Sequence, residues 1–104
     1  RFMRDGQRHG FEWWIHPNQR RVTEERHCWR GEHHGIEREW NERGRLRRGF
    51  ARYYVDGERV SKRQYLRAQT VRPELPPFRE QDQLPEREFP PEVARHLARY
   101  RSSQ

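Results

Sequence analysis

The chain has 104 residues, of which 30% are hydrophobic and 38% are charged, and its formal net charge at pH 7 is +7. This length corresponds to one small domain. Because the apolar fraction is so low, a deep core is excluded, and the 12% aromatic residues must supply most of the buried area. The sequence holds no apolar run long enough to cross a membrane, and its single cysteine, Cys28, cannot form an internal disulfide, so we expect a cytoplasmic protein.

The positive charge is concentrated in the first part of the chain. Residues 1–72 carry 18 Lys and Arg against 10 Asp and Glu, whereas residues 73–104 carry 5 against 6, and Lys62 is the only lysine. Arginine makes planar, bidentate contacts to carboxylates and to phosphates. An acidic protein and a nucleic acid are therefore both candidate partners.

Three stretches of the chain begin with a glycine and continue with a period of two, which is typical of strands with one packed face. The alternating residues are Phe11, Trp13 and Ile15 after Gly10, Ile36, Arg38 and Trp40 after Gly35, and Phe50, Arg52 and Tyr54 after Gly49. Each stretch then meets a turn signal, at residues 16–18, 41–44 and 56–57; the last, Asp-Gly, is a strong hairpin signal. Second strands are predicted at Arg21–Trp29, Arg45–Arg48 and Glu58–Val60. Residues 1–60 are thus predicted to form a short array of antiparallel β-hairpins, which gives a mainly β fold.

The residues that carry this pattern resemble the MORN repeat. The pattern is Gly-x-x-His-Gly, an aromatic residue and then a Gly-containing turn; its best copies are Asp5–Trp14 and Arg30–Gly44, and the resemblance extends over roughly residues 4–65. More closely, the pattern resembles the bacterial MORN-variant repeat proteins described as antitoxin components of toxin–antitoxin systems. The third copy departs from the pattern, because Arg48 stands where histidine is expected. The resemblance implies a scaffold or binding module and not an enzyme.

The second part of the chain has a different character. Residues 61–70 are predicted to form a short capping helix, since Ser61 and Gln64 have capping-box spacing. Residues 71–90 are a proline-rich extended arm with spaced apolar residues. These residues either dock on the chain's own sheet or contact a partner, and the acidic arm beside a basic body favours docking on the sheet. Residues 91–104 are predicted to form an amphipathic helix and tail.

No residue pattern indicates a metal, a cofactor or a reaction. His27, Cys28, His33 and His34 lie close in sequence, but adjacent histidines on a strand or turn point apart. His9 and His34 hold the same position in two copies, as a turn residue does. We expect Cys28 to be structural and Glu24, Glu25, Glu37 and Glu39 to form cross-strand pairs with arginines.

A non-catalytic binding role is therefore predicted, with an acidic protein as the partner and an antitoxin or immunity-type role as one version. If the face that carries the alternating residues is open, the partner-binding residues are Trp13, Arg38, Trp40, Arg52 and Tyr54. If that face is the core, they are Trp14, Glu37, Glu39 and Tyr53.

The alternative is an accessory nucleic-acid-binding or ribonucleoprotein subunit. It would use the densest basic stretch, comprising Arg43, Arg45, Arg47, Arg48, Arg59, Lys62, Arg63 and Arg67. An anionic membrane surface is disfavoured, because the charges are spread through a predicted sheet and not gathered on one amphipathic helix.

Overall fold

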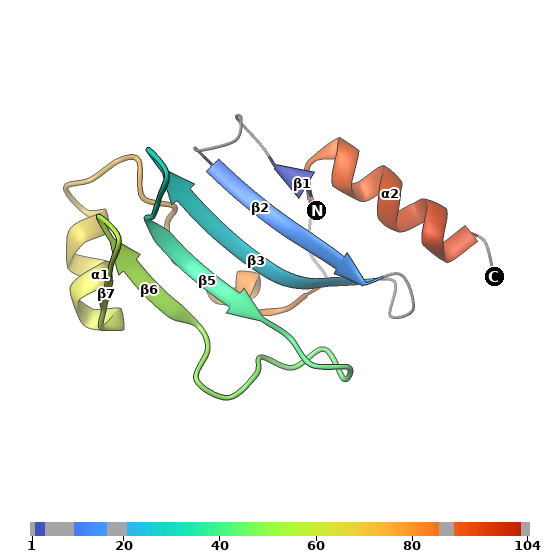
Figure 1. Ribbon diagram of the computed structural model, residues 1–104. Coiled ribbons are helices and arrows are strands. Elements are labelled where there is room, and N and C mark those ends of the chain that lie inside the picture. Colours follow the sequence, from blue (N-terminus) through green and yellow to red (C-terminus); the bar gives the residue numbers. More distant parts are fainter. Residues whose placement is uncertain (1, 4–9, 17–20, 86–88, 103–104) are drawn as a thin grey trace.

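The computed structural model describes residues 2–3, 10–16, 21–85 and 89–102, and these confirm a mainly β fold. All strand pairs in the described part are antiparallel, and the strand order is β1-β2-β3-β5-β6-β7, with β4 paired to β3 (Figure 1). The strands are β1 (Phe2–Met3), β2 (Gly10–His16), β3 (Arg21–Trp29), β4 (Glu32–His33), β5 (Gly35–Glu39), β6 (Arg52–Val55) and β7 (Glu58–Val60). The helices are α1 (Lys62–Gln69), the 3-10 helix η1 (Glu80–Gln83) and α2 (Pro91–Ser102).

Two-residue turns close the hairpins β3–β4 and β6–β7. Arg30 and Gly31 have φ values of 52° and 81°, and Asp56 and Gly57 have values of 52° and 84°. Two successive positive φ values match the right-handed twist of the flanking strands, so the predicted Asp56-Gly57 turn is confirmed. The turn predicted at residues 16–18 lies largely outside the described residues.

The strand predicted at Arg45–Arg48 is wrong. Residues 41–51 form a long connection between β5 and β6, and in it only Leu46 forms a β-bridge, an isolated one with Trp40 just beyond the end of β5. Gly44 and Gly49 both have positive φ values, 75° and 88°. Two such residues on either side of a four-residue stretch interrupt the extended backbone that a strand needs.

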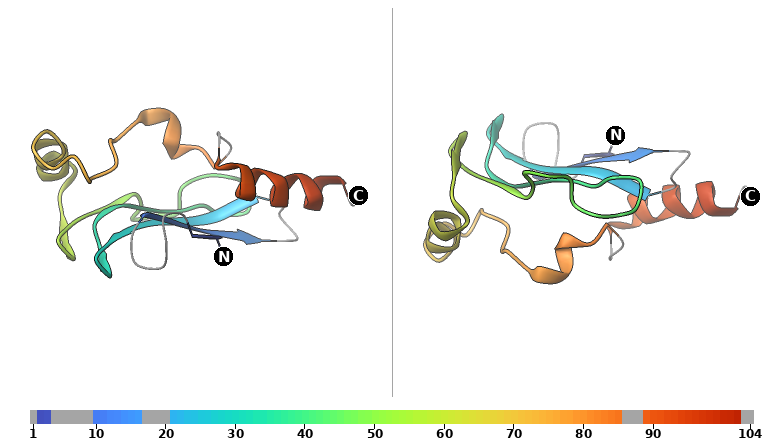
Figure 2. Two further views of the ribbon diagram at one scale, coloured as in Figure 1. Left: turned by 90° about the horizontal axis from the view of Figure 1, so that it is seen from above. Right: turned by 90° about the horizontal axis from the view of Figure 1, so that it is seen from below.

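One face of the sheet is covered by the chain's own second part. Figure 2 shows α1, the arm and α2 all on the same side of the strands. The core under this cover has two clusters. The first contains Trp13, Val22, Trp40, Val93 and Leu97, and the second contains Ile36, Tyr53, Tyr65 and Leu75. Alternation along the strands therefore places Trp13, Ile36 and Trp40 inside, as their spacing predicts.

Helix α1 forms as its sequence predicts. The Ser61 hydroxyl accepts a hydrogen bond from the Gln64 backbone N–H at 3.1 Å, and the Gln64 side chain accepts one from the Ser61 N–H at 2.8 Å. This reciprocal capping box satisfies two N–H groups that the first turn leaves without helical partners. Tyr65 is fully buried against the sheet.

The proline-rich arm docks on the chain's own sheet and helix. The Tyr65 hydroxyl donates to the Pro76 carbonyl, the Phe78 N–H donates to the Gln69 side chain at 2.9 Å, and Trp40 Nε1 donates to the Gln83 carbonyl at 2.7 Å. Val71 and Leu84 are the exceptions among the apolar residues of the arm, with 74% and 59% of their surfaces exposed. None of the described helices is long and apolar enough to cross a membrane.

Candidate functional site

The face of the sheet that points away from α1, the arm and α2 is here called the open face, because no described helix or arm segment crosses it (Figure 2). Strand register assigns residues to it: Trp14 pairs with Glu24, Glu24 with Glu39, Glu37 with Arg52, and Tyr54 with Arg59. The open face thus comprises Glu12, Trp14, Glu24, Arg26, Cys28, His33, Glu37, Glu39, Arg52, Tyr54 and Arg59.

The half of the open face on β2, β3 and β5 is rich in glutamate. Arg26 lies between two neighbours, with its Nε 3.4 Å from a Glu37 oxygen and its guanidinium 4.9 Å from the centre of the Trp14 ring. Glu24 and Glu39 are direct cross-strand partners of like charge. Burial and then the Glu39 carboxylate raise the pKa of Glu24 above its ordinary value. This half therefore combines a half-buried tryptophan with carboxylates and one arginine.

The half of the open face on β4, β6 and β7 is basic and aromatic. The Arg52 guanidinium lies 4.3 Å from the ring centre of Phe50, and the His33 and Tyr54 rings meet edge to face at 4.9 Å. Arg59 is exposed beside Tyr54. Arginine and tyrosine are enriched among the residues that dominate binding energy at protein interfaces.

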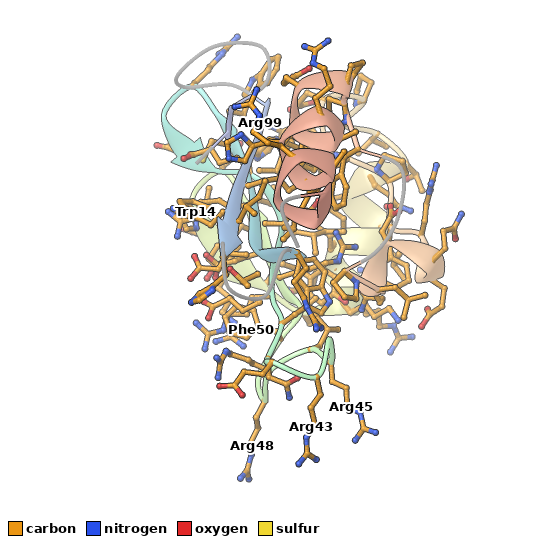
Figure 3. All side chains as sticks on the ribbon, turned by 90° about the vertical axis from the view of Figure 1, so that its right-hand side faces the viewer. Trp14, Arg43, Arg45, Arg48, Phe50 and Arg99 are labelled. Atoms are coloured by element: carbon orange, nitrogen blue, oxygen red, sulfur yellow. The ribbon has the colours of Figure 1, made fainter. Side chains whose placement is uncertain are left out.

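An arginine-rich connection borders the open face. Residues 41–49, here called the arginine loop, contain Arg43, Arg45, Arg47 and Arg48, and all four are exposed. Figure 3 shows Arg43, Arg45 and Arg48 pointing away from the body of the molecule, with Trp14 on the side of the sheet opposite the arm. The other predicted basic residues, Arg59, Lys62, Arg63 and Arg67, are also exposed, on β7 and α1.

The set of residues predicted for an open, alternating face is divided between two faces. Trp13, Arg38 and Trp40 are buried on the covered face, with exposed fractions of 3%, 2% and 1%. The prediction that they are accessible to a partner is wrong, because the arm and α2 lie over them. Arg52 and Tyr54 lie on the open face.

The second predicted set fits the open face better. Trp14, Glu37 and Glu39 lie there, whereas Tyr53 is buried in the core. Tyr53 faces inward because it pairs with Ile36. The third copy of the pattern is therefore shifted by one residue relative to the second, and such a shift moves every side chain to the other face.

A buried charged pair joins the sheet to the arm. Glu25 is fully buried; one of its oxygens accepts from Arg38 Nη1 at 2.8 Å and the other from Trp13 Nε1 at 2.8 Å. Arg38 Nε donates to the Gln83 side chain at 2.6 Å, whereas its Nη2 has no hydrogen-bond partner among the described residues. Burial lowers the pKa of Arg38. The hydrogen bond between Arg38 and Gln83 links this buried pair to the arm.

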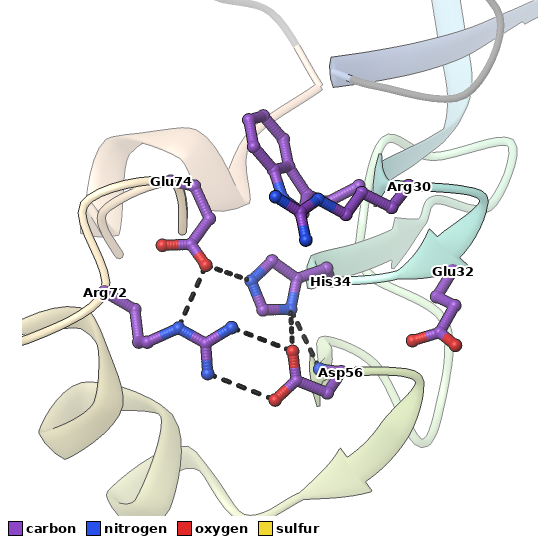
Figure 4. Close-up of a pocket in the computed structure, with 7 residues that line it drawn as sticks. Arg30, Glu32, His34, Asp56, Arg72 and Glu74 are labelled. Atoms are coloured by element: carbon purple, nitrogen blue, oxygen red, sulfur yellow. Dashed lines mark hydrogen bonds and ion pairs between the residues drawn. The ribbon is translucent and has the colours of Figure 1, made fainter.

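A second polar network lines a cavity of about 350 Å³ beside α1 and the β6–β7 turn (Figure 4). His34 is 1% exposed; its Nε2 donates to Glu74 at 3.0 Å, and its Nδ1 accepts from the Asp56 backbone N–H at 2.8 Å. Arg72 holds Glu74 through Nε at 2.9 Å and Asp56 through both terminal nitrogens, at 2.8 and 3.1 Å. The network ties the start of the arm to two hairpin turns. His34 is therefore a buried cross-link, and its assignment as a simple turn residue is wrong; His9 lies outside the described residues.

The chemistry open to this cavity is limited by its own hydrogen bonds. A general base needs a lone pair that can reach a substrate proton, but the Nδ1 lone pair of His34 is taken by the Asp56 backbone. Of the three carboxylates in the lining, those of Asp56 and Glu74 are held by Arg72, whereas Glu32 is exposed. The described lining includes no serine, threonine or cysteine that would serve as a nucleophile. Across the described ranges, no three His, Cys, Asp or Glu side chains are placed to hold a metal ion.

This network predicts an acid-sensitive contribution to stability. Hydrogen bonds from Arg72 lower the pKa of Asp56 below its ordinary 3.8, and hydrogen bonds to its own backbone, His34 and Arg72 lower that of Glu74 below 4.5. A depressed native pKa stabilises the fold above the unfolded value, and this contribution is lost as the pH falls through the native one. Asp56→Asn keeps a residue that tolerates positive φ and should show a smaller loss of stability between pH 7 and pH 3 than the unaltered protein.

Urea unfolding at both pH values measures the effect. Arg72→Gln should also reduce the loss of stability between pH 7 and pH 3. The double variant should reduce this loss little further than either single change. An unaltered difference between pH 7 and pH 3 in both variants would show that the network does not couple folding to protonation.

Comparison of the chain with protein-family models, with curated proteins and with solved structures finds no match.

Proposed function

We propose that the protein is a non-catalytic binding module whose open face contacts a protein with an acidic surface. The observation that carries the proposal is the asymmetry of the sheet. The arm, α1 and α2 cover one face of the sheet. Trp14 and Tyr54 lie on the opposite face, and no described element crosses them. Large aromatic side chains in such positions mark interaction surfaces more often than isolated exposed residues do.

The size and rigidity of the open face support this proposal. The molecule measures 45 × 29 × 18 Å, so its broad side exceeds the roughly 800 Å² that each partner contributes to a protein interface of standard size. Arg26 and Arg52 are already held by stacking on Trp14 and Phe50. Side chains ordered before binding lose less conformational entropy when the complex forms.

The charge distribution supports an acidic partner. The net charge is +7, and Arg52 and Arg59 flank Tyr54 on the open face. Carboxylates of a partner would pair with these arginines around the Tyr54 ring, and complementary charge raises the association rate as well as specificity. The glutamates near Trp14 would disfavour acidic groups there, so the complex would have a defined orientation.

The MORN-like resemblance is part of this proposal, and so are the cytoplasmic location and the antitoxin or immunity-type role. Successive antiparallel hairpins across β2 to β7 fit that expectation. A flat sheet that covers an acidic surface of a toxin would neutralise it by steric occlusion, with no reaction required. The self-satisfied hydrogen bonds around His34 support the absence of catalysis.

The test begins with affinity capture of the tagged full chain after nuclease treatment, and binding is then measured with the captured protein in purified form. Trp14→Ala and Tyr54→Ala are each expected to weaken binding by about 30-fold, the effect of a residue worth about 2 kcal/mol at an interface. Leu84→Ala is the control, since Leu84 is exposed on the side of the arm. Loss of binding in the Leu84 variant, with both open-face variants unaffected, would contradict the proposal.

A further inference from the structure

We infer that the arginine loop and α1 form a second binding surface, for the phosphate backbone of a nucleic acid. This surface is separate from the open-face contact at Trp14 and Tyr54. It uses exposed cations that form no ion pair with the described residues, and it can therefore be tested separately from the protein partner.

The guanidinium groups of the arginine loop form no ion pairs with the residues that the structure describes, although the charge of Arg47 acts to lower the pKa of Glu24. This holds for Arg43, Arg45, Arg47 and Arg48 alike, although acidic side chains are abundant in the chain. By contrast, Arg26, Arg38 and Arg72 each contact a carboxylate. The loop therefore concentrates positive charge on one projecting segment, as Figure 3 shows for Arg43, Arg45 and Arg48.

The backbone of the arginine loop is held in place by hydrogen bonds. The Asn41 side-chain oxygen accepts from the N–H groups of Arg43 and Arg45 at 2.9 and 3.1 Å, and the Asn41 N–H donates to the Arg45 carbonyl at 2.8 Å. Leu46 packs against the first core cluster. The loop is thus anchored at its centre, and the arginines are presented from an ordered backbone, which reduces the entropy lost on binding.

Helix α1 carries charges that are unfavourable for the isolated helix. Its first turn has no acidic residue but contains Lys62 and Arg63, where the helix dipole favours negative charge. Arg63 and Arg67 are spaced by four residues, so two like charges lie side by side on one exposed face. A phosphate group near this turn would be attracted both by the cations and by the dipole. An anion bound here would offset both the unfavourable interaction of the cations with the helix dipole and the repulsion between Arg63 and Arg67.

The two groups of cations border the same part of the sheet on different sides, the arginine loop below it and α1 at its left in Figure 1. The arginine loop connects β5 to β6, and α1 directly follows the edge strand β7, so both border the β5–β7 part of the sheet in Figure 1. Glu24, Glu37 and Glu39 lie on the open face beyond this border and would repel phosphates. A nucleic acid carries one charge on every nucleotide, so a single strand that follows the border can meet both groups, whereas one compact carboxylate cluster would meet only one.

The experiment measures binding of the full chain to a short fluorescent single-stranded oligonucleotide, and to the duplex of the same sequence, over a series of salt concentrations. Affinity should fall log-linearly with salt. The variants Arg43→Gln/Arg45→Gln and Arg63→Gln/Arg67→Gln should each reduce the slope for the single strand by about 1.4, since each lost phosphate contact contributes about 0.7. Arg79→Gln/Arg95→Gln removes the same charge from exposed positions on the arm and α2 and should leave the slope unchanged.

Three results would overturn the inference. The first is no binding by the unaltered chain at low salt. The second is an equal reduction of the slope by all three pairs, which would mean that only net charge matters. The third is equal affinity for polyglutamate of matched charge, which would assign the surface to an acidic protein. Trp14→Ala and Tyr54→Ala should leave oligonucleotide binding unchanged, so failure of this inference is distinguishable from failure of the open-face proposal.

Discussion

Replacing Arg38 by methionine is expected to destabilise the protein by about 3–5 kcal/mol, the range found when one partner of a buried ion pair is removed. Glu25 is fully buried, and the variant would remove its ion pair with Arg38 Nη1 while the hydrogen bond from Trp13 Nε1 remains. The Gln83 side chain would also lose its donor, Arg38 Nε. The arm should therefore loosen at η1 as the global stability falls.

Urea unfolding gives the free energy, and two further variants make the result specific. Arg95→Met removes the same charge at an exposed position of α2 and should cost far less. The double change Glu25→Leu/Arg38→Met should recover much of the loss, because apolar residues of similar volume replace a buried pair at little cost. Equal destabilisation by Arg38→Met and Arg95→Met would contradict the buried position of the pair.

Trp40→Ala should cost about 3–5 kcal/mol, as is typical for removal of a buried tryptophan. Trp40 is 1% exposed, packs in the cluster that includes Val93 and Leu97 of α2, and donates its indole N–H to the Gln83 carbonyl. Its loss leaves a cavity under α2 and an unsatisfied carbonyl on the arm.

Trp14→Ala is the matched control for Trp40→Ala, because it removes the same side chain from the opposite face. Trp14 is half-buried on the open face, so its removal should destabilise the fold clearly less than removal of Trp40. Thermal and urea unfolding of both variants check the order. A larger cost for Trp14 would mean that the two faces have been assigned the wrong way round.

Local sequence signals predicted much of the fold. The strands Arg21–Trp29 and Glu58–Val60 have the bounds that alternation and the Asp-Gly turn predict, and the helix Lys62–Gln69 lies within the predicted range 61–70, whose end residues cap it. These signals act over a few residues: a turn type is set by its own φ values, and a cap by a side chain three residues away. They do not depend on contacts between residues far apart in the chain.

The wrong predictions concern features that are determined by contacts between residues far apart in the chain. The pairing of β6 with β5 across the long arginine loop determines which face of the sheet Tyr53 and Tyr54 point to. The register expected from the glycine pattern differs from the observed one by one residue. The alternation of Arg38 with Ile36 and Trp40 correctly predicts that Arg38 lies on the same face as these two core residues. Its partners, Glu25 and Gln83, lie 13 and 45 positions away in the chain, so the sequence offered no local signal for a buried pair.

The same reason explains the network around His34. Its contact with Glu74 spans 40 positions and its contact with Asp56 spans 22. Repeat position alone predicts a turn residue there, whereas docking of the arm turns it into a buried cross-link. The exposure of the basic residues could be predicted, since a stretch as dense in arginine as residues 43–48 cannot bury all of its charges.

Site-specific photo-crosslinking in cells tests the central claim most directly. A photoreactive amino acid is placed at position 54 on the open face and, as the control, at position 92 on the exposed surface of α2. The open-face proposal predicts one defined acidic protein crosslinked from position 54, reduced by Trp14→Ala and absent from position 92. Crosslinks of that protein from position 92 with none from position 54 would contradict it.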